Sequence, residues 1–214
     1  MNIHLSRLHF PVRSLGPGQR IGIWFQGCSI RCPGCISADT WAVTGGEATL
    51  ELVLEQVCPW LPHADGFTIS GGEPFDQPDA LVALVRALRE MSSGDILVYS
   101  GHPIESLAGI LAQTDGLIDA LITDPFELDA PHTRPLRGSD NQRLHFLTEL
   151  GRERFSQYQR DLCKSDKSLD VMFDEDGTVW FAGIPNRNDF HRLRDLLTDQ
   201  GHSVQISADK AQNR

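Results

Sequence analysis

The feature that most constrains the fold of this 214-residue chain is an alternation of short apolar runs with amphipathic segments. Residues 79–91 and 104–113 repeat apolar side chains at helical spacing. Strands that alternate with helices in this way predict stacked β–α–β units around a mainly parallel sheet. We therefore expect an α/β fold whose sheet closes partly into a barrel, with functional loops after the strands. The apolar runs of strand length stand at residues 20–26, 66–70, 95–99 and 117–123.

The two ends of the chain depart from this alternation. Residues 2–10 alternate apolar and polar side chains, which predicts an edge strand or an extended arm. Past residue 150 the pattern predicts a helix, a β-hairpin and a second helix, with the hairpin turn at Asp174-Glu175-Asp176-Gly177. We therefore divide the chain into a core over residues 1–150 and a small α+β extension over residues 151–214. The extension is expected either to cover an exposed sheet edge or barrel face or to recognise the substrate.

Charge and hydropathy exclude two classes of partner. A formal net charge of −10 argues against general binding to the nucleic-acid backbone, which requires clustered Lys and Arg. No apolar run approaches the roughly 18 residues that span a bilayer, and the first residues do not form a signal peptide. We therefore expect a cytoplasmic protein without a membrane partner. One basic cluster predicts either an anion-binding surface or a solvated loop, and it consists of His132, Arg134, Arg137, Arg143 and His145.

Three of the five cysteines lie close together, directly after a predicted strand. Cys28, Cys32 and Cys35 follow the spacing C-x3-C-x2-C. An odd number of cysteines and their tight clustering disfavour a disulfide framework. Thiolates are soft ligands that suit iron–sulfur clusters or zinc. The other two, Cys58 and Cys163, are far apart in the sequence, and we expect each to be a small buried hydrophobic residue.

Three clustered thiols fit a four-iron cluster better than a structural zinc site. A structural zinc ion requires a fourth protein ligand, and no further Cys or nearby His follows within the loop. Three ligands on a [4Fe–4S] cube leave one iron free to bind a small molecule. The flanking Gly27 and Gly34 allow the positive φ angles and close backbone approach that such a loop requires. A zinc site or an incidental cysteine cluster is the alternative.

The string GCSIRCPGCISADTW, which spans residues 27–41, resembles the cluster loop of radical S-adenosylmethionine (SAM) enzymes. It is most similar to the small activating enzymes of anaerobic ribonucleotide reductase. The Cys-Pro-Gly-Cys element, the pair Thr40-Trp41 and the turn Gly16-Pro17-Gly18 carry this resemblance. The resemblance implies a partial (β/α) barrel of the radical SAM type, one [4Fe–4S] cluster on the three loop cysteines, and SAM as the second cofactor.

The same resemblance implies a SAM-binding surface at the strand ends. The turn Gly71-Gly72-Glu73-Pro74 is similar to the turn that holds the methionine amino group of SAM in this family, and a bare turn is the alternative. Ser100, after the next predicted strand, and Asp124, after the one that follows, are further candidates. Thr123-Asp124 replaces the usual Asp-Gly pair of the family, so Asp124 is alternatively a cap of the turn after its strand.

The chemistry implied by the resemblance is reductive cleavage of SAM to a 5′-deoxyadenosyl radical, which then removes a hydrogen atom from a substrate. The cofactors supply this step, so no catalytic side chain beyond the cluster is expected. An external one-electron reductant of the flavodoxin or ferredoxin type is implied. The expected target is a glycyl-radical partner enzyme. A different peptide or small-molecule substrate is one alternative, and a non-catalytic iron–sulfur or zinc-binding regulatory protein is another.

Overall fold

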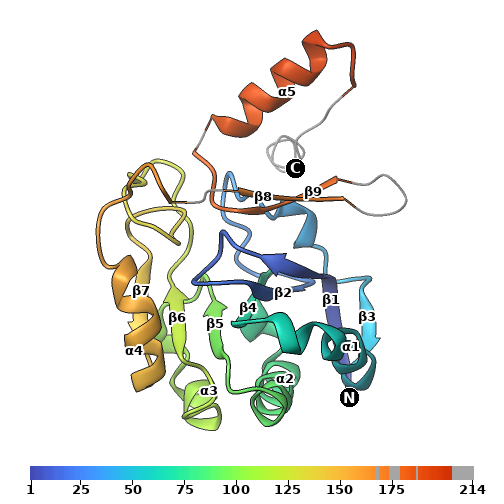
Figure 1. Cartoon of the computed structure of the whole chain (residues 1–214), viewed down its shortest axis with the longest axis vertical. Coiled ribbons are helices and arrows are strands. Elements are labelled where there is room, and N and C mark those ends of the chain that lie inside the picture. The colour runs from blue at the N-terminus through green and yellow to red at the C-terminus, as the bar shows by residue number, and fades with distance from the viewer. Residues whose placement is uncertain (167–168, 174–178, 187, 204–214) are drawn as a thin grey trace.

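The computed structural model of the chain describes residues 1–166, 169–173, 179–186 and 188–203 (Figure 1). Its centre is a seven-stranded sheet in the order β3-β1-β2-β4-β5-β6-β7. The strands of this sheet are β1 (Asn2–Val12), β2 (Arg20–Phe25), β3 (Glu47–Thr49), β4 (Gly66–Gly71), β5 (Asp95–Tyr99), β6 (Ala120–Thr123) and β7 (Arg143–Phe146). The other elements are α1 (Leu50–Val57), α2 (Pro78–Met91), α3 (Ala108–Gln113), α4 (Glu149–Phe155), β8 (Leu169–Phe173), β9 (Val179–Gly183) and α5 (Asp189–Asp199).

The four central strands, β2, β4, β5 and β6, run parallel and arise from the four apolar runs of the sequence. β1, β3 and β7 extend this sheet in the antiparallel direction. The expected α/β fold with a mainly parallel sheet is therefore confirmed. Because every parallel connection returns through a helix, the loops after the parallel strands all open at one edge of the sheet. No helix in the described ranges is both long and apolar enough to span a bilayer.

One face of the sheet is covered by α1, α2 and α3 (Figure 1). Successive residues of a strand point to opposite faces, so every second strand residue meets these helices. The burial of α2 follows the helical period, which leaves its charged residues in solvent. This larger core includes Ile21, Ile23, Phe25, Ile69, Leu81, Leu84, Leu88, Ile96, Val98 and Leu121.

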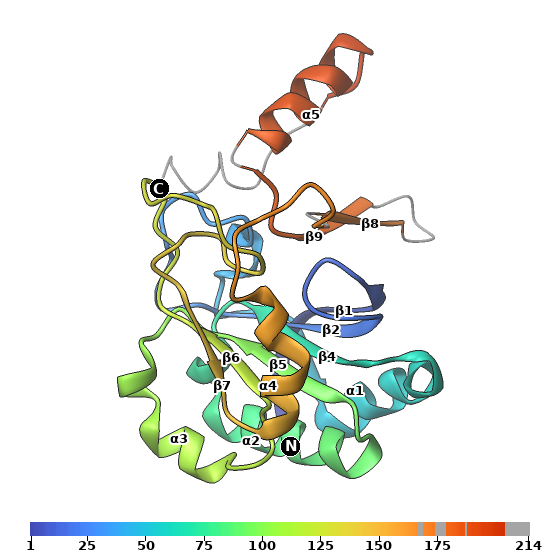
Figure 2. The ribbon, with the colours of Figure 1, turned by 60° about the vertical axis from the view of Figure 1, so that its left-hand side comes forward.

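The opposite face is covered by the segment that follows residue 148. Phe155 of α4 packs on Leu97 of β5 and Ile122 of β6. The hairpin of β8 and β9 lies over β1 and β2 in both views (Figures 1 and 2), where Met172 packs against Trp24. The C-terminal elements therefore complete the burial of a sheet face that the three crossover helices leave open.

A buried ion-pair network attaches α4 to this second face. Arg20 is 0% exposed, and its guanidinium donates to Oγ1 of Thr68 at 2.6 Å and to Oδ1 of Asp95 at 2.5 Å. The second carboxylate oxygen of Asp95 accepts from Nε of Arg154, on α4, at 2.9 Å. A buried charge that loses its partner costs about 3–5 kcal/mol. The network therefore fixes the position of α4 on the sheet.

The edge strands of the sheet differ from the sequence prediction, and the predicted hairpin turn cannot be compared with the structure. β3 pairs with Asn2–His4 at the start of β1 and forms the edge of the sheet there, so the expectation that β1 is an edge strand is wrong for these residues. The rest of β1 pairs with β2. β3 and β7 are three and four residues long, too short to display the alternation that marks a strand in a sequence. The predicted hairpin turn at residues 174–177 lies outside the described residues.

Candidate functional site

The loops that follow the parallel strands meet at the carboxyl edge of the sheet. The loop after β2 carries the three clustered cysteines, and the loop after β4 is the glycine-rich turn that begins at Gly71. Two backbone hydrogen bonds of 2.8 Å join these loops, from the N–H of Gly72 to the carbonyl of Phe25 and from the N–H of Glu73 to that of Gly27. The structure therefore brings together segments that lie about forty-five residues apart in the sequence.

The cysteine loop closes back on its own first residues. Gly27 and Gly34 adopt φ angles of 98° and 74°, which an L-residue rarely adopts, as the sequence predicted for a tightly wrapped loop. Residues 36–42, the returning arm of the cysteine loop, then run beside the start of the loop. The N–H of Gly27 donates to the carbonyl of Thr40 at 2.7 Å, and the N–H of Cys28 donates to that of Trp41 at 3.3 Å. The loop is thus a closed ring of backbone around the thiols.

The three thiols lie within electrostatic reach of one another. Burial raises the pKa of Cys28 and Cys32 above the ordinary thiol value and that of Cys35 to about 11. Negative charge on Cys28 raises the pKa of Cys32 further, and charge on either of them raises that of Cys35. All three are therefore protonated at neutral pH in the metal-free chain, and a bound metal must displace those protons.

Several N–H groups are directed at the sulfurs. The N–H of Arg31 lies 3.5 Å from Sγ of Cys28, and the N–H groups of Ser37 and of the Trp41 indole lower the pKa of Cys35. Trp41 Nε1 is buried and has no hydrogen bond of regular length. N–H groups of this kind stabilise the negative charge of an iron–sulfur centre. These donors fit the chemistry of an iron–sulfur cluster.

The structure gives a reason for the paired glycines of the turn, Gly71 and Gly72, that could not be predicted from the sequence. Gly71 has a φ angle of 106°, and a Cβ at this position would collide with the backbone of Phe25. A Cβ on Gly72 would collide with the carbonyl oxygen of Gly27. We expected the glycines to admit a ligand, but the close approach in the structure is between the ends of two strands. Their role in ligand binding stays a prediction.

Glu73 and Ser100, both predicted site residues, hydrogen-bond to each other inside this edge. Glu73 is 1% exposed, and its Oε1 accepts from the hydroxyl of Ser100 and from the N–H of Phe75, each at 3.0 Å. Its Oε2 accepts from the N–H of Gly101 at 2.7 Å. Burial raises the pKa of Glu73 despite these donors. The carboxylate therefore connects the end of β4 to the end of β5.

Asp76 and His102 form a second connection that sequence reasoning missed. Oδ2 of Asp76 accepts from the N–H of Ser29 at 2.7 Å, and Oδ1 accepts from the Ser29 hydroxyl at 2.9 Å. His102 Nε2 lies 3.4 Å from the same Oδ1. Ser29 directly follows the first loop cysteine, whereas Asp76 and His102 follow β4 and β5. No spacing within the sequence indicates a contact between three separate loops.

Asp124 lies at this edge, but its carboxylate is occupied by protein groups. Nε of Arg143 donates to it at 2.7 Å, and the Thr123 hydroxyl donates at 2.9 Å. Burial opposes ionisation, yet these donors leave the pKa of Asp124 below its ordinary value. Arg143 also binds Glu105 at 2.8 Å, so it is paired within the fold and does not belong to a free anion-binding patch. These contacts fit the interpretation of Asp124 as a cap.

The expectation that the two isolated cysteines are buried is wrong. Cys58 is exposed because it follows Val57, which points into the core at the end of α1, and the next residue of a helix is rotated by about 100°. Cys163 is also exposed, and its Sγ lies 3.1 Å from the hydroxyl of Ser165. Both thiols lie outside the cysteine loop, so their substitution can serve as a control for substitution of a loop cysteine.

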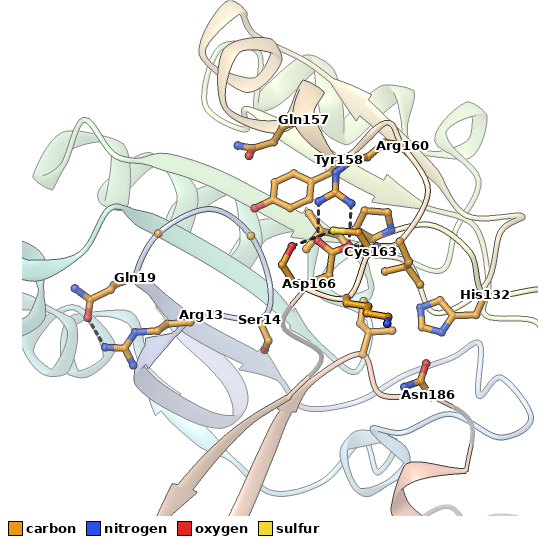
Figure 3. A pocket seen from close by; sticks show the side chains of 18 residues that line it. Arg13, Ser14, Gln19, His132, Gln157, Tyr158, Arg160, Cys163, Asp166 and Asn186 are labelled. Atoms are coloured by element: carbon orange, nitrogen blue, oxygen red, sulfur yellow. Dashed lines mark hydrogen bonds and ion pairs between the residues drawn. The ribbon is translucent and has the colours of Figure 1, made fainter.

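A separate hollow of about 1010 Å³ lies between the turn at residues 13–19 and the segments 157–166 and 184–186 (Figure 3). Three of its charged side chains are engaged within the protein. Arg160 pairs with Asp166 at 2.6 Å, and Arg13 donates to Gln19 at 2.8 Å. The hollow lies between the core and the C-terminal elements. It is separate from the thiol site, since its lining includes no residue of the cysteine loop.

Comparison with known proteins supports the interpretation of this edge as an iron–sulfur site. Residues 14–145 match the family described as "4Fe-4S single cluster domain". The anaerobic ribonucleoside-triphosphate reductase-activating protein of Escherichia coli is 31% identical over 156 residues, which cover 69% of this chain and 99% of that protein. The pyruvate formate-lyase-activating enzyme of Clostridium pasteurianum is 35% identical over 105 residues, which cover 47% of this chain and 44% of that enzyme.

The matched domain and the three clustered cysteines together identify an iron–sulfur protein. The chain belongs to the 4Fe–4S single cluster domain family and, within it, to the radical SAM activating enzymes. It is therefore an enzyme.

Proposed function

We propose that the chain cleaves SAM reductively at a [4Fe–4S] cluster held by Cys28, Cys32 and Cys35. The observation that carries this proposal is the closed cysteine loop at the carboxyl edge of a parallel sheet. Its Cys28 is buried, its Cys32 and Cys35 are half-buried, and the three thiols lie within electrostatic reach of one another. Three thiolate ligands leave one iron of a cube free for SAM. When bound, the cluster supplies the electron that separates SAM into methionine and a 5′-deoxyadenosyl radical.

The protein groups around this site position and shield the cofactors. We propose that the turn Gly71-Pro74 receives the methionine part of SAM and that Ser100 lies beside it. Glu73 fixes both segments through its three hydrogen bonds. We assign a positioning role to Asp76, which joins Ser29 of the cysteine loop to the loop after β5. Asp124 stays a candidate ligand whose carboxylate would first have to leave Arg143.

The proposed target is a glycyl-radical enzyme, which the radical derived from SAM activates by removing a hydrogen atom. The names of the relatives, activating proteins of a ribonucleoside-triphosphate reductase and of pyruvate formate-lyase, support this target class. A flavodoxin- or ferredoxin-like protein would supply the electron. We propose a cytoplasmic enzyme, with a partial-barrel core over residues 1–150 and an extension over residues 151–214 that the matched family does not include.

The test is anaerobic incubation of the reconstituted protein with SAM and a strong reductant, followed by assay for 5′-deoxyadenosine. Cys32→Ser removes one proposed ligand and is expected to abolish both the brown colour of the cluster and the product. Cys58→Ser and Cys163→Ser are matched controls, because both thiols are exposed and lie outside the loop. They are expected to retain cluster and product.

Two results would contradict the proposal. A Cys32→Ser protein that still makes 5′-deoxyadenosine would show that the ligands are wrong. A wild-type protein that holds its cluster but produces no 5′-deoxyadenosine would instead favour a regulatory iron–sulfur protein. The target is tested separately, by mixing the reduced enzyme and SAM with a candidate partner and measuring a glycyl-radical signal by electron paramagnetic resonance.

A further inference from the structure

Arg7, on β1, lies where the C-terminal hairpin covers the sheet. Its guanidinium carbon is 4.0 Å from the ring centre of Trp180, on β9, and 5.9 Å from that of Trp24, on β2. A register shift in the pairing of β1 with β2, between Leu5 and Arg7, sets Arg7 opposite Trp24. The side chain is 15% exposed. Arg7 is thus enclosed by the aromatic residues of two different sheets.

The same guanidinium forms an ion pair with Asp39, which lies in the returning arm of the cysteine loop. Asp39 belongs to a short 3₁₀ turn, Ala38–Thr40, that follows the third cysteine. Two backbone hydrogen bonds hold the residues after Asp39 against the start of the loop. The ion pair with Arg7 is a side-chain attachment of the same arm to the sheet.

The arm carries donors that act on the sulfur of Cys35. Trp41 Nε1, two residues after Asp39, is buried and has no hydrogen bond of regular length in the metal-free protein. Ser37, two residues before Asp39, caps the same short turn, and its N–H and the indole N–H both lower the pKa of the Cys35 thiol. A shift of Asp39 would therefore move donors on both of its sides. Hydrogen bonds to the sulfurs of an iron–sulfur centre stabilise the reduced, more negative state and raise the reduction potential.

We propose that Arg7 is a positioning residue that couples the C-terminal hairpin to the cluster loop and sets the placement of the donors to Cys35. This inference rests on the proposed function, because it takes Cys35 as a cluster ligand. The stacking of Arg7 on Trp180 connects it to the hairpin, and its ion pair with Asp39 connects it to the cysteine loop. The C-terminal elements therefore influence the electronic properties of the site while the hairpin covers β1 and β2.

The chemistry of the guanidinium explains why Arg occupies this position. A guanidinium can stack its flat face on an aromatic ring and still donate N–H groups in its own plane. An ammonium group is a point charge and cannot keep both the stacking and the directed pair. We expect Arg7→Lys to retain part of the function and Arg7→Gln to lose it.

The first experiment uses the full-length, metal-free protein and so does not depend on SAM cleavage. Hydrogen–deuterium exchange is measured for residues 36–42 in the wild type, Arg7→Gln, Arg7→Lys and Arg86→Gln. Arg86 is an exposed residue of α2 and provides the matched control. The loss of a partly buried ion pair with its aromatic stacking is expected to raise exchange of the loop by about tenfold in Arg7→Gln. Arg7→Lys is expected to lie between Arg7→Gln and the wild type.

The second experiment measures the midpoint potential of the reconstituted cluster in the same variants. Arg7→Gln and Trp180→Leu are both expected to make it more negative, because the donors to Cys35 are no longer held in place. The double variant Arg7→Gln/Asp39→Asn is expected to match Arg7→Gln alone, since the two residues act as one unit. Exchange and potential that equal those of Arg86→Gln would overturn the proposal.

A general rise of exchange in Arg7→Gln, including β4 and β5, would also overturn it, since Arg7 would then stabilise only the fold. These outcomes differ from a failure of the proposed function. A wild-type protein without SAM cleavage contradicts that function, whereas loop exchange and cluster potential still decide the role of Arg7.

Discussion

Glu73 is a carboxylate that water barely reaches, yet three N–H and O–H groups donate to it. Two of the donors, Ser100 and Gly101, belong to the end of the neighbouring strand. The hydrogen bonds offset the cost of burying a charge, which would otherwise amount to several kcal/mol. At the scale of single residues, the edge of the sheet is therefore organised by an acid whose interactions stay within the protein.

Replacing this acid tests how much of the edge depends on it. Glu73→Gln leaves an NH2 group facing donors, so we expect a loss of about 1–3 kcal/mol in the free energy of unfolding. Urea unfolding of the metal-free protein measures the loss, with the exposed Glu55→Gln in α1 as control. A Glu73→Gln protein as stable as the control would show that the three contacts contribute nothing.

The raised pKa of Glu73 also predicts how this loss depends on pH. The folded state binds the proton more tightly than the unfolded state, so the contribution is full below the ordinary glutamate value of about 4.3 and is lost as pH rises through the folded value. Glutamine does not titrate. The free energy of unfolding of the wild type is therefore expected to approach that of Glu73→Gln as pH rises above the ordinary glutamate value. A gap that widens with pH would mean that the folded pKa is lowered.

Single residues also show what the sequence can and cannot predict. The three loop cysteines, Glu73 and Ser100 were proposed as site residues because their motifs are contiguous in the chain. The structure places them at one edge of the sheet, and their roles stay predictions. Asp76 and His102 were missed because their contact exists only after two strands have paired. The burial of Cys58 was predicted wrongly, because one step along a helix decides between core and solvent.

Among the elements, the hairpin of β8 and β9 has two dissimilar faces. Met172 and Ala182 are buried against the β1–β2 layer, whereas Val171 and Phe173 on the opposite face are 49% and 76% exposed. The sequence predicted two strands here but not which face is covered, since both faces carry apolar side chains. The covered face is determined by Trp24 and its neighbours, which come from the other end of the chain.

Asp170 fixes the hairpin to the core at one point. Its Oδ2 accepts from the N–H groups of Arg13 and Ser14 and from the Ser14 hydroxyl, each at 2.7 Å. In Asp170→Asn, an uncharged amide oxygen makes weaker bonds to the same donors. We expect limited proteolysis to cut residues 169–183 several times faster, while Asp129→Asn, an exposed control, stays at the wild-type rate. Equal rates in the two variants would show that the hairpin is held by its apolar face alone.

For the whole molecule, the central question is how a sheet with two apolar faces is protected. The crossover helices were predictable from helical spacing, and they cover the first face. A cover formed by the C-terminal segment was one of two interpretations of the sequence, but its position could not be predicted, because α4 and the hairpin follow the sheet in sequence and carry no signal of where they dock. β3 and β7 were missed for a related reason, since short antiparallel strands depend on their partners rather than on their own periodicity.

Truncation after residue 166 tests this division of roles. Removing the hairpin exposes Val12, Leu15 and Trp24, which are at most 6% exposed in the full chain. The larger core on the other face does not include the hairpin, so the sheet is expected to fold. We expect a loss of about 3 kcal/mol, or roughly 6–12 °C in Tm, and new binding of a dye for apolar surfaces. An unfolded truncated chain would show that the hairpin is part of the folding unit.

The contact of Gly72 with the carbonyl of Gly27 has a mechanical consequence. The backbones of the turn and of Gly27 are in direct contact, with no side chain between them. The turn and the first cysteine, Cys28, are therefore expected to move together. A molecule that binds the turn and displaces it would therefore also displace the backbone of Cys28 and its sulfur, because no flexible segment separates the two.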